Sequence, residues 1–563
     1  MAEEIDNAPG GVSAQGVRVD TPAQQLTAGE TRRARLSRWA WPAGLAGAAV
    51  VLFVCYLRLS GTVPDNSDGS DQALQAWDML HGNWLLHGWT VGDVSYYTTE
   101  LPEYILVELV RGLGPSVIHV AAAVTYTLLV LLAGLLAKGR ATGREGVFRA
   151  LIAAGILLAP QLGHGVHLLI QQPDHIGTQV PLLVILIVLD RGPRRWYVPA
   201  AIGVMLTWVI IADRVAALEV ALPLAVVCGV RAGWAYVHAG KRLAALWYEY
   251  SLMAAGILSF GAAALVVSVI KHLGGYTSLP LPAQLAPLGG LPHHVVVTVE
   301  GILTLYGASF TGLSTWVAVA IAAVHLAGLA LALWAVCRAF RRFMSASDLI
   351  VPVMATGIVI NLAAYMFSIV PSTWFDTREI PSVLPFGAVL AGRLLAEPLL
   401  ARARKSALLK PALAVVLACY AAALGYGAVQ PSVTDGEHPV VAWLAAHHLR
   451  TGLGTYTEAN VITLDSGGRI AIRTVSWRPT GAVPRAYESK ASWYDPRLSY
   501  ANFIVTNSAD GSNTSVIPRG DILALAGPPA HTYHYQTFTI MVWNHNLLAD
   551  LGSPPSASPG NIP

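Results

Sequence analysis

The sequence predicts a polytopic α-helical membrane protein with about 11 transmembrane helices, followed by a small α/β domain. Three observations predict this class. Hydrophobic residues make up 54% of the 563 residues and charged residues only 12%, whereas soluble domains carry about 25% charged residues. The apolar residues form blocks of about 20, the length that crosses a bilayer. Clusters of Lys and Arg occupy every second connection between these blocks, as the positive-inside rule requires of cytoplasmic loops.

The apolar blocks define the spans in order. The first is predicted from Trp39 to Leu59, and the arginines just before it place the N-terminus in the cytoplasm. Later spans are predicted at Ser116–Ala137, Phe148–Leu162, Thr178–Leu189, Tyr197–Ala212, a block ending at Arg231, Tyr250–Ile270, Leu313–Val336, Leu349–Val370, Ser382–Leu395 and Pro411–Val429. This order predicts a C-terminus outside. The segment His293–Tyr306 is apolar enough to be re-entrant or interfacial.

The composition also divides the chain into parts. Charged residues return after residue 437 and apolar runs shorten to strand length, which predicts an extracytoplasmic α/β domain. The predicted parts are a disordered cytoplasmic tail at 1–38, a membrane domain at 39–430, an acidic outer loop within it at 60–115, the α/β domain at 431–550 and a disordered tail at 551–563. Within the α/β domain, helices are predicted at Pro439–Leu449 and Pro518–Ala526, and strands at Arg469–Val475, Asn502–Thr506 and within Tyr533–Trp543.

The outer loop after the first predicted span is the most unusual stretch. From Ser60 to Val110 it holds eight carboxylates and neither Lys nor Arg. A loop that only joined two helices would not need so many uncompensated charges at a membrane face, so the pattern indicates an anionic, catalytic or cation-binding mouth. A solvated acidic loop is the alternative. Helical spacing of apolar residues at Ser70–Leu80 and Tyr104–Leu113 predicts two interfacial amphipathic helices.

Motifs in this loop resemble those of GT-C glycosyltransferases, the superfamily that includes protein mannosyltransferases and lipid A aminoarabinose transferases. Asp68 is followed eleven positions later by Met79–Trp84 (MLHGNW), which is similar to the family's Met-Leu and Gly-x-Trp elements. Tyr96–Pro102 (YYTTELP) is similar to its aromatic–Glu–Lys–Pro–Pro stretch. Arg378 precedes Pro385 by seven positions, as in the family's Arg-Tyr-x-x-Pro-x-x-Pro motif.

The resemblance implies an inverting transfer of a sugar from a polyprenyl-phosphate donor to a glycan, lipid or protein acceptor of the cell envelope. The protein would lie in a bacterial plasma membrane, with the active site outside. A carboxylate would deprotonate the acceptor, and a cation would stabilise the departing phosphate. The sequence departs from the family at its Asp-Glu pair, which is Asp68-Gly69 here. The expected catalytic residues are therefore Asp68, with Asp71 or Glu100 as the second carboxylate.

Other roles for these residues remain open. Asp68 could instead cap a helix that begins near Ser70, a position that suits Asp. The donor phosphate is expected at Arg378 and Arg214, because a guanidinium offers two parallel hydrogen bonds to phosphate. The alternatives are local pairs of Arg378 with Asp376 or Glu379 and of Arg214 with Asp213, and Lys271 is a further candidate for the phosphate.

Aromatic and histidine residues complete the candidate site. Trp77, Trp84 and Tyr97 are expected to line a substrate groove. His164, His167 and Asp174 lie in the second outer loop and are candidate ligands of a divalent cation, although single interfacial histidines are commoner.

Two other function classes compete with the glycosyltransferase. One is a transporter or a flippase for lipid-linked glycans, and the other is a non-catalytic envelope scaffold. Transporters place their charged residues near the membrane midplane, whereas the acidity here is concentrated in one outer loop. The chain has no nucleic-acid signature.

Overall fold

The computed structural model describes residues 28–238, 240, 242–279, 284–343, 348–433, 439–478, 481–508 and 519–552. The chain divides into two units at Val50, and the contacts discussed below all belong to the second, Val51–Pro563. Most of the predicted tails, 1–38 and 551–563, lies outside the described residues. The described part of the first tail is helical, because α1 (Ala28–Ser60) begins before the predicted span.

Nine helical segments within the described residues are long and apolar enough to cross a membrane. Eight contain predicted spans: α1, α4 (Ser116–Lys138), α9 (Leu222–His238) with the π-turn η1 (Ala217–Ala221), α10 (Trp247–His272) with η2 (Leu243–Leu246), α12 (Trp316–Arg341), α13 (Ile350–Phe367), α14 (Val383–Lys405) and α15 (Leu409–Ala428). The ninth combines η3 (Leu288–Gly290) and α11 (Leu291–Leu305), in the segment predicted to be re-entrant or interfacial. The chain is a multi-pass membrane protein.

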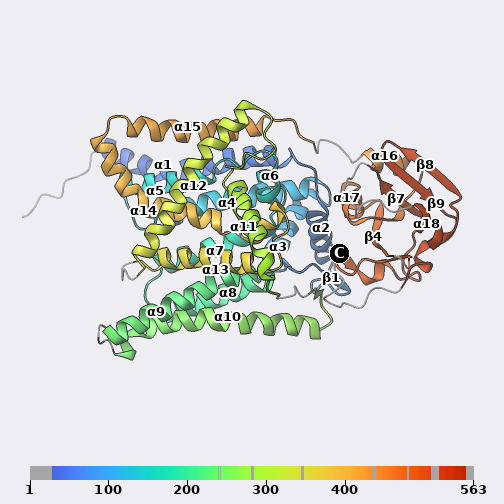
Figure 1. Ribbon diagram of the computed structural model, residues 1–563, viewed down its shortest axis with the longest axis horizontal. Helices are drawn as coiled ribbons and strands as arrows, with labels where there is room; N and C mark the ends of the chain where they lie inside the picture. The colour runs from blue at the N-terminus through green and yellow to red at the C-terminus, as the bar shows by residue number, and fades with distance from the viewer. Residues whose placement is uncertain are drawn as a thin grey trace, which may run out of the picture. The chain divides into compact units, whose positions relative to one another are not determined.

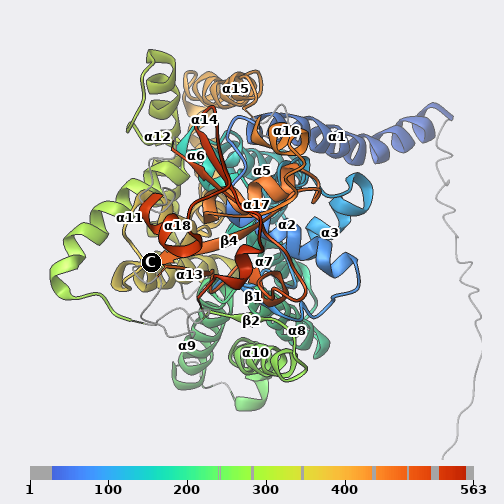
Figure 2. The same cartoon turned by 90° about the vertical axis from the view of Figure 1, so that its right-hand side faces the viewer.

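Three further predicted spans form shorter or more polar helices. They are α5 (Gly143–Leu157), α7 (Asp174–Arg191) and α8 (Tyr197–Ala212). Helix α7 carries charged residues at both ends, and α8 is apolar but only 16 residues long. Helix α8 packs along α10 beside α9, as both views show (Figures 1 and 2). The span count of eleven and the N-inside orientation remain predictions.

The two helices predicted in the acidic loop are present as α2 (Ser67–Leu80) and α3 (Glu100–Arg111). Helix α2 is buried rather than interfacial, since its small residues Ala73 and Ala76 are fully enclosed and let neighbouring helices approach. Its N-cap is Asn66, whose side chain accepts a hydrogen bond from the Gly69 amide at 2.9 Å. The capping role considered for Asp68 is therefore wrong, and Asp68 lies in the first turn.

Two short outer helices complete the surroundings of the acidic loop. The first, α6 (His164–Leu169), precedes α7, and the second, η4 (Trp374–Glu379), precedes α14. A capping box closes the start of η4, because the Asp376 side chain accepts a hydrogen bond from the Thr373 backbone amide and the Thr373 side chain accepts one from the Asp376 backbone amide. Gly301 on α11 lets η4 approach closely, since a Cβ there would lie 1.7 Å from Thr377 Cγ2.

The C-terminal part forms a small α/β domain (Figure 1). Its described elements are α16 (Pro439–Ala446), β3 (Thr451–Gly454), α17 (Tyr456–Asp465), β4 (Ala471–Arg478), β5 (Gly481–Pro484), β6 (Ser489–Lys490), η5 (Ala491–Trp493), β7 (Phe503–Asn507), α18 (Arg519–Ala526), β8 (His531–Tyr535), β9 (Phe538–Val542) and η6 (Leu547–Ala549). Six strands form one sheet in the order β5-β4-β3-β7-β9-β8, with β4, β3 and β7 parallel. The predicted helices and strands are present, but β3, α17, β5 and β6 were not predicted.

A second, three-stranded sheet joins this domain to the acidic loop. Strand β1 (Trp89–Val91) pairs in parallel with β2 (Thr277–Ser278), which lies beside it in Figure 2. It also pairs antiparallel with β6. An ion pair of 2.9 Å between Lys490 Nζ and Asp78 Oδ2 stabilises the same junction. The acidic loop is therefore held between the membrane helices and the C-terminal domain.

The close approach at Gly301 predicts a specific effect of Gly301→Ala. The added methyl group would displace Thr377 and η4, and overpacking of this kind costs about 1–3 kcal/mol of unfolding free energy. We expect a lower thermal unfolding midpoint in detergent. The control is Gly261→Ala on α10, where an added Cβ has no described atom within 4 Å. Equal stability of the two variants would show that η4 does not depend on this contact.

A buried acid on α3 predicts a pH effect. Glu108 is 2% exposed, and neither carboxylate oxygen has a hydrogen-bond partner among the described residues. Burial raises the pKa of Glu108 to about 9. Between its ordinary value and pH 9 the folded state keeps a proton that the unfolded state releases, so stability falls as pH rises, by at most about 1.4 kcal/mol per unit. Glu108→Gln removes this dependence.

The measurement is the unfolding midpoint between pH 5 and pH 9. We expect the advantage of Glu108→Gln over wild type to grow with pH, whereas the exposed control Glu397→Gln should follow wild type. Parallel curves for all three proteins would mean that Glu108 titrates like a surface carboxylate.

Candidate active site

A small cavity lies where α2, the loop after β1, the start of α7, η4 and the C-terminal domain meet. Its volume is about 40 Å³, roughly the room of one water molecule. Its lining brings together six carboxylates and one guanidinium: Asp68, Asp71, Asp93, Asp174, Glu379, Glu488 and Arg378. Two of the three expected catalytic carboxylates, Asp68 and Asp71, are among them.

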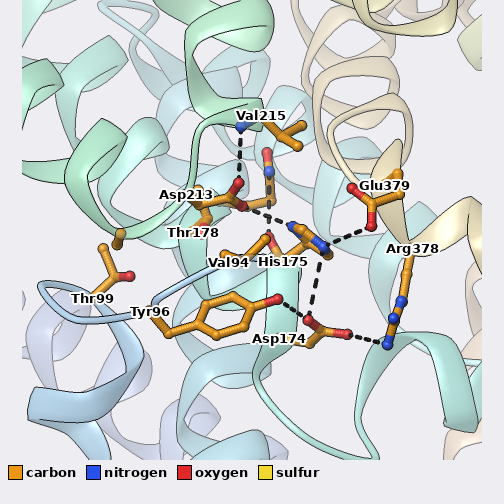
Figure 3. A network of polar contacts seen from close by, with 12 residues as sticks. Val94, Tyr96, Thr99, Asp174, His175, Thr178, Asp213, Val215, Arg378 and Glu379 are labelled. Carbon is orange, nitrogen blue, oxygen red and sulfur yellow. Dashed lines mark hydrogen bonds and ion pairs between the residues drawn. The ribbon is translucent and has the colours of Figure 1, made fainter. Parts of the chain in front are cut away.

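Arg378 is the central cation of this cavity. Its Nη1 lies 2.9 Å from Asp68 Oδ2 and 3.7 Å from Asp174 Oδ2, and the latter pair is drawn in Figure 3. Asp376, one of the two local partners that the sequence suggested for Arg378, instead accepts hydrogen bonds from the backbone amides of Ser372 and Thr373 at the start of η4. The contact from η4 to α2 joins residues 310 positions apart, so it belongs to the tertiary fold and not to one loop.

Asp174 is held from a second side by a buried polar network (Figure 3). The hydroxyl of Tyr96 donates a hydrogen bond to Asp174 Oδ1. His175 lies between Asp213, at 2.8 Å, and Glu379, at 3.2 Å. Asp213 also accepts a hydrogen bond of 2.8 Å from the Val215 amide. The adjacent pair of Asp213 with Arg214 that the sequence suggested is therefore wrong.

Backbone strain is concentrated at the same point. Tyr96 has a φ of 50° and Asp174 a φ of 43°, in the left-handed region that non-glycine residues rarely adopt. The two strained residues hydrogen-bond to each other. Strain of this kind, about 1–3 kcal/mol for each residue, persists where the surroundings over-determine the geometry, and it clusters at functional sites.

The C-terminal domain supplies the fourth side of the cavity. The hydroxyl of Tyr456, the first residue of α17, donates a hydrogen bond to Asp68 Oδ1. Arg485 stacks over the Tyr456 ring at 3.6 Å and pairs with Glu488 at 3.5 Å. The sequence reasoning missed all three residues, because no motif marks them and α17 was not predicted.

Two of the lining acids have raised pKa values. Burial and the nearby Asp68 raise the pKa of Glu488 to about 7. Burial and Glu488 raise the pKa of Asp71, whose Oδ2 accepts a hydrogen bond from Gln75 while its buried Oδ1 has no partner in the described structure. Burial therefore favours the protonated, uncharged form of Asp71.

Glu100, the third expected catalytic carboxylate, faces a different cavity. That cavity has a volume of about 190 Å³ and is lined by Glu103, Thr125 and Trp208 among others. Glu100 accepts hydrogen bonds from the hydroxyls of Thr99 and Thr178. Burial raises its pKa. The structure does not bring Glu100 together with Asp68.

A larger groove adjoins the acidic cavity. It has a volume of about 530 Å³ and lies between α8, η1 and α10. Its walls are apolar, with Ile210, Phe260, Ala263, Ala264 and Val267 among them, and its polar end carries Arg214 and Lys271. Neither cation forms an ion pair with a described residue. Asp93 and Ser95 line both the groove and the acidic cavity, so the two spaces meet there.

The residues expected to bind metal are not brought together. His164 stacks on Trp374 with ring centroids 3.9 Å apart. Asp174 accepts a hydrogen bond from Tyr96 and forms an ion pair with Arg378. No group of three or more His, Cys, Asp or Glu side chains in the described residues is arranged to hold a metal ion, so His164, His167 and Asp174 form no such group. Arg378 already supplies positive charge between Asp68 and Asp174, and these residues therefore do not fit a divalent cation.

The expected aromatic groove residues lie around the site but not in its lining. Trp77 packs against His81, and Trp84 is 57% exposed. The hydroxyl of Tyr97 donates a hydrogen bond of 2.8 Å to the Trp84 carbonyl. None of these three aromatic residues lines the acidic cavity or the apolar groove.

No protein-family model matches the sequence, and no curated protein matches it. The structure is similar to ArnT from Cupriavidus metallidurans bound to undecaprenyl phosphate, with a TM-score of 0.53 and 12% identity over 92% of this chain and 99% of that chain. The same ArnT in the apo state gives a TM-score of 0.51 and 13% identity over 92% of this chain and 100% of that chain. The Archaeoglobus fulgidus oligosaccharyltransferase in complex with Zn and sulfate gives a TM-score of 0.46 and 13% identity over 88% of this chain and 73% of that chain. This likeness shows that the chain shares the fold of ArnT, and it confirms the fold that the sequence motifs predicted.

Proposed function

We propose that this protein is a membrane glycosyltransferase that moves a sugar from a polyprenyl-phosphate donor to a cell-envelope acceptor on the outer face. One observation carries the proposal: an apolar groove with two cations at its end meets a carboxylate-rich cavity at Asp93 and Ser95. A lipid phosphate fits the groove, and a proton acceptor belongs in the cavity. The undecaprenyl phosphate bound to the ArnT of similar fold supports this class of donor.

The groove would hold the donor through two kinds of contact. Helices α8 and α10 offer an apolar wall to the polyprenyl chain, and burial of each CH₂ group contributes about 0.8 kcal/mol. Arg214 and Lys271 would bind the phosphate, because their charges are not neutralised by described carboxylates. Arg378, also expected at the phosphate, is already paired with Asp68 and Asp174. We therefore assign it to hold these two carboxylates in place.

The reaction then needs one proton transfer and one displacement. The acceptor hydroxyl gives its proton to a cavity carboxylate while its oxygen attacks the anomeric carbon. The bond from that carbon to the phosphate oxygen breaks on the opposite face, which inverts the configuration. Polyprenyl phosphate leaves with the bonding electrons and with its charge stabilised by Arg214 and Lys271.

Asp68 is the carboxylate that we propose as the base. Its Oδ1 already accepts a hydrogen bond from the hydroxyl of Tyr456, which is the contact that an acceptor hydroxyl would make. Asp93 is the competing base, because it lines both spaces and burial, followed by the nearby Glu379, raises its pKa.

The test of function uses purified protein in nanodiscs with a panel of undecaprenyl-phosphate sugars and envelope extracts as acceptors. We expect at least one donor to release undecaprenyl phosphate as sugar appears on an acceptor. Asp68→Asn should lower that rate about 10²–10⁴-fold, the usual loss on removing a positioned base. Asp93→Asn, measured in parallel, distinguishes the two carboxylates.

The matched control is Asp71→Asn in the same cavity. Because burial favours the protonated form of Asp71, the amide replaces an uncharged acid of the same shape, and we expect activity near wild type. Full activity in Asp68→Asn, or release from none of the donors by wild type, would contradict the proposal.

The phosphate assignment predicts a second set of effects. Arg214→Ala and Lys271→Ala should each raise the KM for donor about ten- to a hundredfold, because a charged hydrogen bond contributes about 1.5–3 kcal/mol. The KM for acceptor should not change. Arg111→Ala, a cation at the end of α3 outside the groove, is the control. The assignment is wrong if all three variants use donor equally well.

A further inference from the structure

A second large cavity lies at the opposite ends of the helices. It has a volume of about 670 Å³, and its lining residues come from the loop between α4 and α5, the last turn of α7, the start of α10 and the middle of α14, among other elements. Helix α7 begins at the active-site cluster and ends at this cavity, and its 18 residues span about 27 Å. The cavity is therefore separate from the active site.

Arg393 lines this cavity with a buried side chain, and it is called the Arg393 floor below. Its guanidinium is 5% exposed and pairs with Asp190 at 2.7 Å and with Asp348 at 3.3 Å. Its Nε donates a hydrogen bond of 2.9 Å to the Leu136 carbonyl. One buried cation thus uses two of the four carboxylates that line the cavity.

Two other arginines keep their charge uncompensated. Arg140 donates to the backbone carbonyl of Asp190 and Arg231 to that of Asp348, each at 2.9 Å. Neither guanidinium forms an ion pair with a described carboxylate. Five arginines line the cavity against four carboxylates, and these two face it with free donors. The site is therefore built for an anion.

The surroundings indicate what carries that anion. Arg194 and Tyr248 line the cavity, and within two residues of them the indole rings of Trp196 and Trp247 are 76% and 41% exposed. Exposed tryptophans at helix ends mark the level of lipid headgroups. The basic clusters of the sequence predict that this end is cytoplasmic, and basic pockets between transmembrane helices on that side bind anionic headgroups.

We propose that this cavity binds the phosphate headgroup of an anionic phospholipid, held by Arg140 and Arg231 over the Arg393 floor. The lipid would join the ends of α7 and α9 and the start of α13, which no loop on this side connects to one another. The proposal does not depend on the catalytic assignment.

The test measures phosphatidylglycerol binding to detergent-purified protein by native mass spectrometry and by the thermal unfolding midpoint. We expect wild type to retain one phosphatidylglycerol in preference to phosphatidylcholine and to be stabilised by it. Arg140→Ala/Arg231→Ala should weaken this binding at least about tenfold. The control pair Arg195→Ala/Arg404→Ala removes the same charge from exposed positions outside the cavity, and it should bind like wild type.

Each other outcome counts against the proposal. Equal phosphatidylglycerol binding by the two pairs would exclude the cavity as the site. Stabilisation by soluble glycerol 3-phosphate to the same extent as by lipid would identify a free phosphate ligand and exclude the lipid. If the alanine pair does not fold, Arg140→Gln/Arg231→Gln keeps polar donors without charge, and retention of wild-type affinity in that pair would overturn the proposal.

Discussion

The pairing of Arg378 with Asp68 and Asp174 is the interaction on which the rest of the site depends. Asp174 is buried and Asp68 is half-buried, so these two carboxylates repel each other and lose hydration, and a guanidinium between them offsets both effects. Arg378 reaches them only because η4 packs closely on α11, where Gly301 leaves room for Thr377. The packing of Thr377 on Gly301, outside the cavity, therefore helps to position the Arg378 guanidinium inside it.

The candidate site holds most of its carboxylates in one space and its two unpaired cations in another. Carboxylates occupy the cavity beneath the C-terminal domain, and unpaired cations occupy the end of the apolar groove. A phosphate bound among the carboxylates would be repelled, and a base placed beside Arg214 and Lys271 would lose proton affinity. The two spaces meet at Asp93 and Ser95, so one site can contain both the carboxylates and the unpaired cations.

The sequence predicted the helical membrane fold and half of the site, for identifiable physical reasons. Periodicity and length predicted the long spans, but α5 and α7 are short and carry polar ends, so hydropathy describes them poorly. Asp68 and Arg378 were found because motif residues surround them. Tyr456 and Glu488 lie in a domain without motifs, and their role depends on a tertiary contact that no local pattern records. Glu100 was misplaced because one residue of register changes the face of α3 on which a side chain lies.

The order in which the site's parts leave the ribosome has a consequence for biogenesis. Asp68 meets Arg378 across 310 positions and Tyr456 across 388. At about 5–20 residues synthesised per second, roughly 20–80 s separate the first member of this trio from the last. During that interval the acidic loop lacks the partners that pair with Asp68 in the folded protein. The assembled cavity is thus a late event, completed only when the C-terminal domain emerges, and a chain that ends before Tyr456 lacks one wall of it.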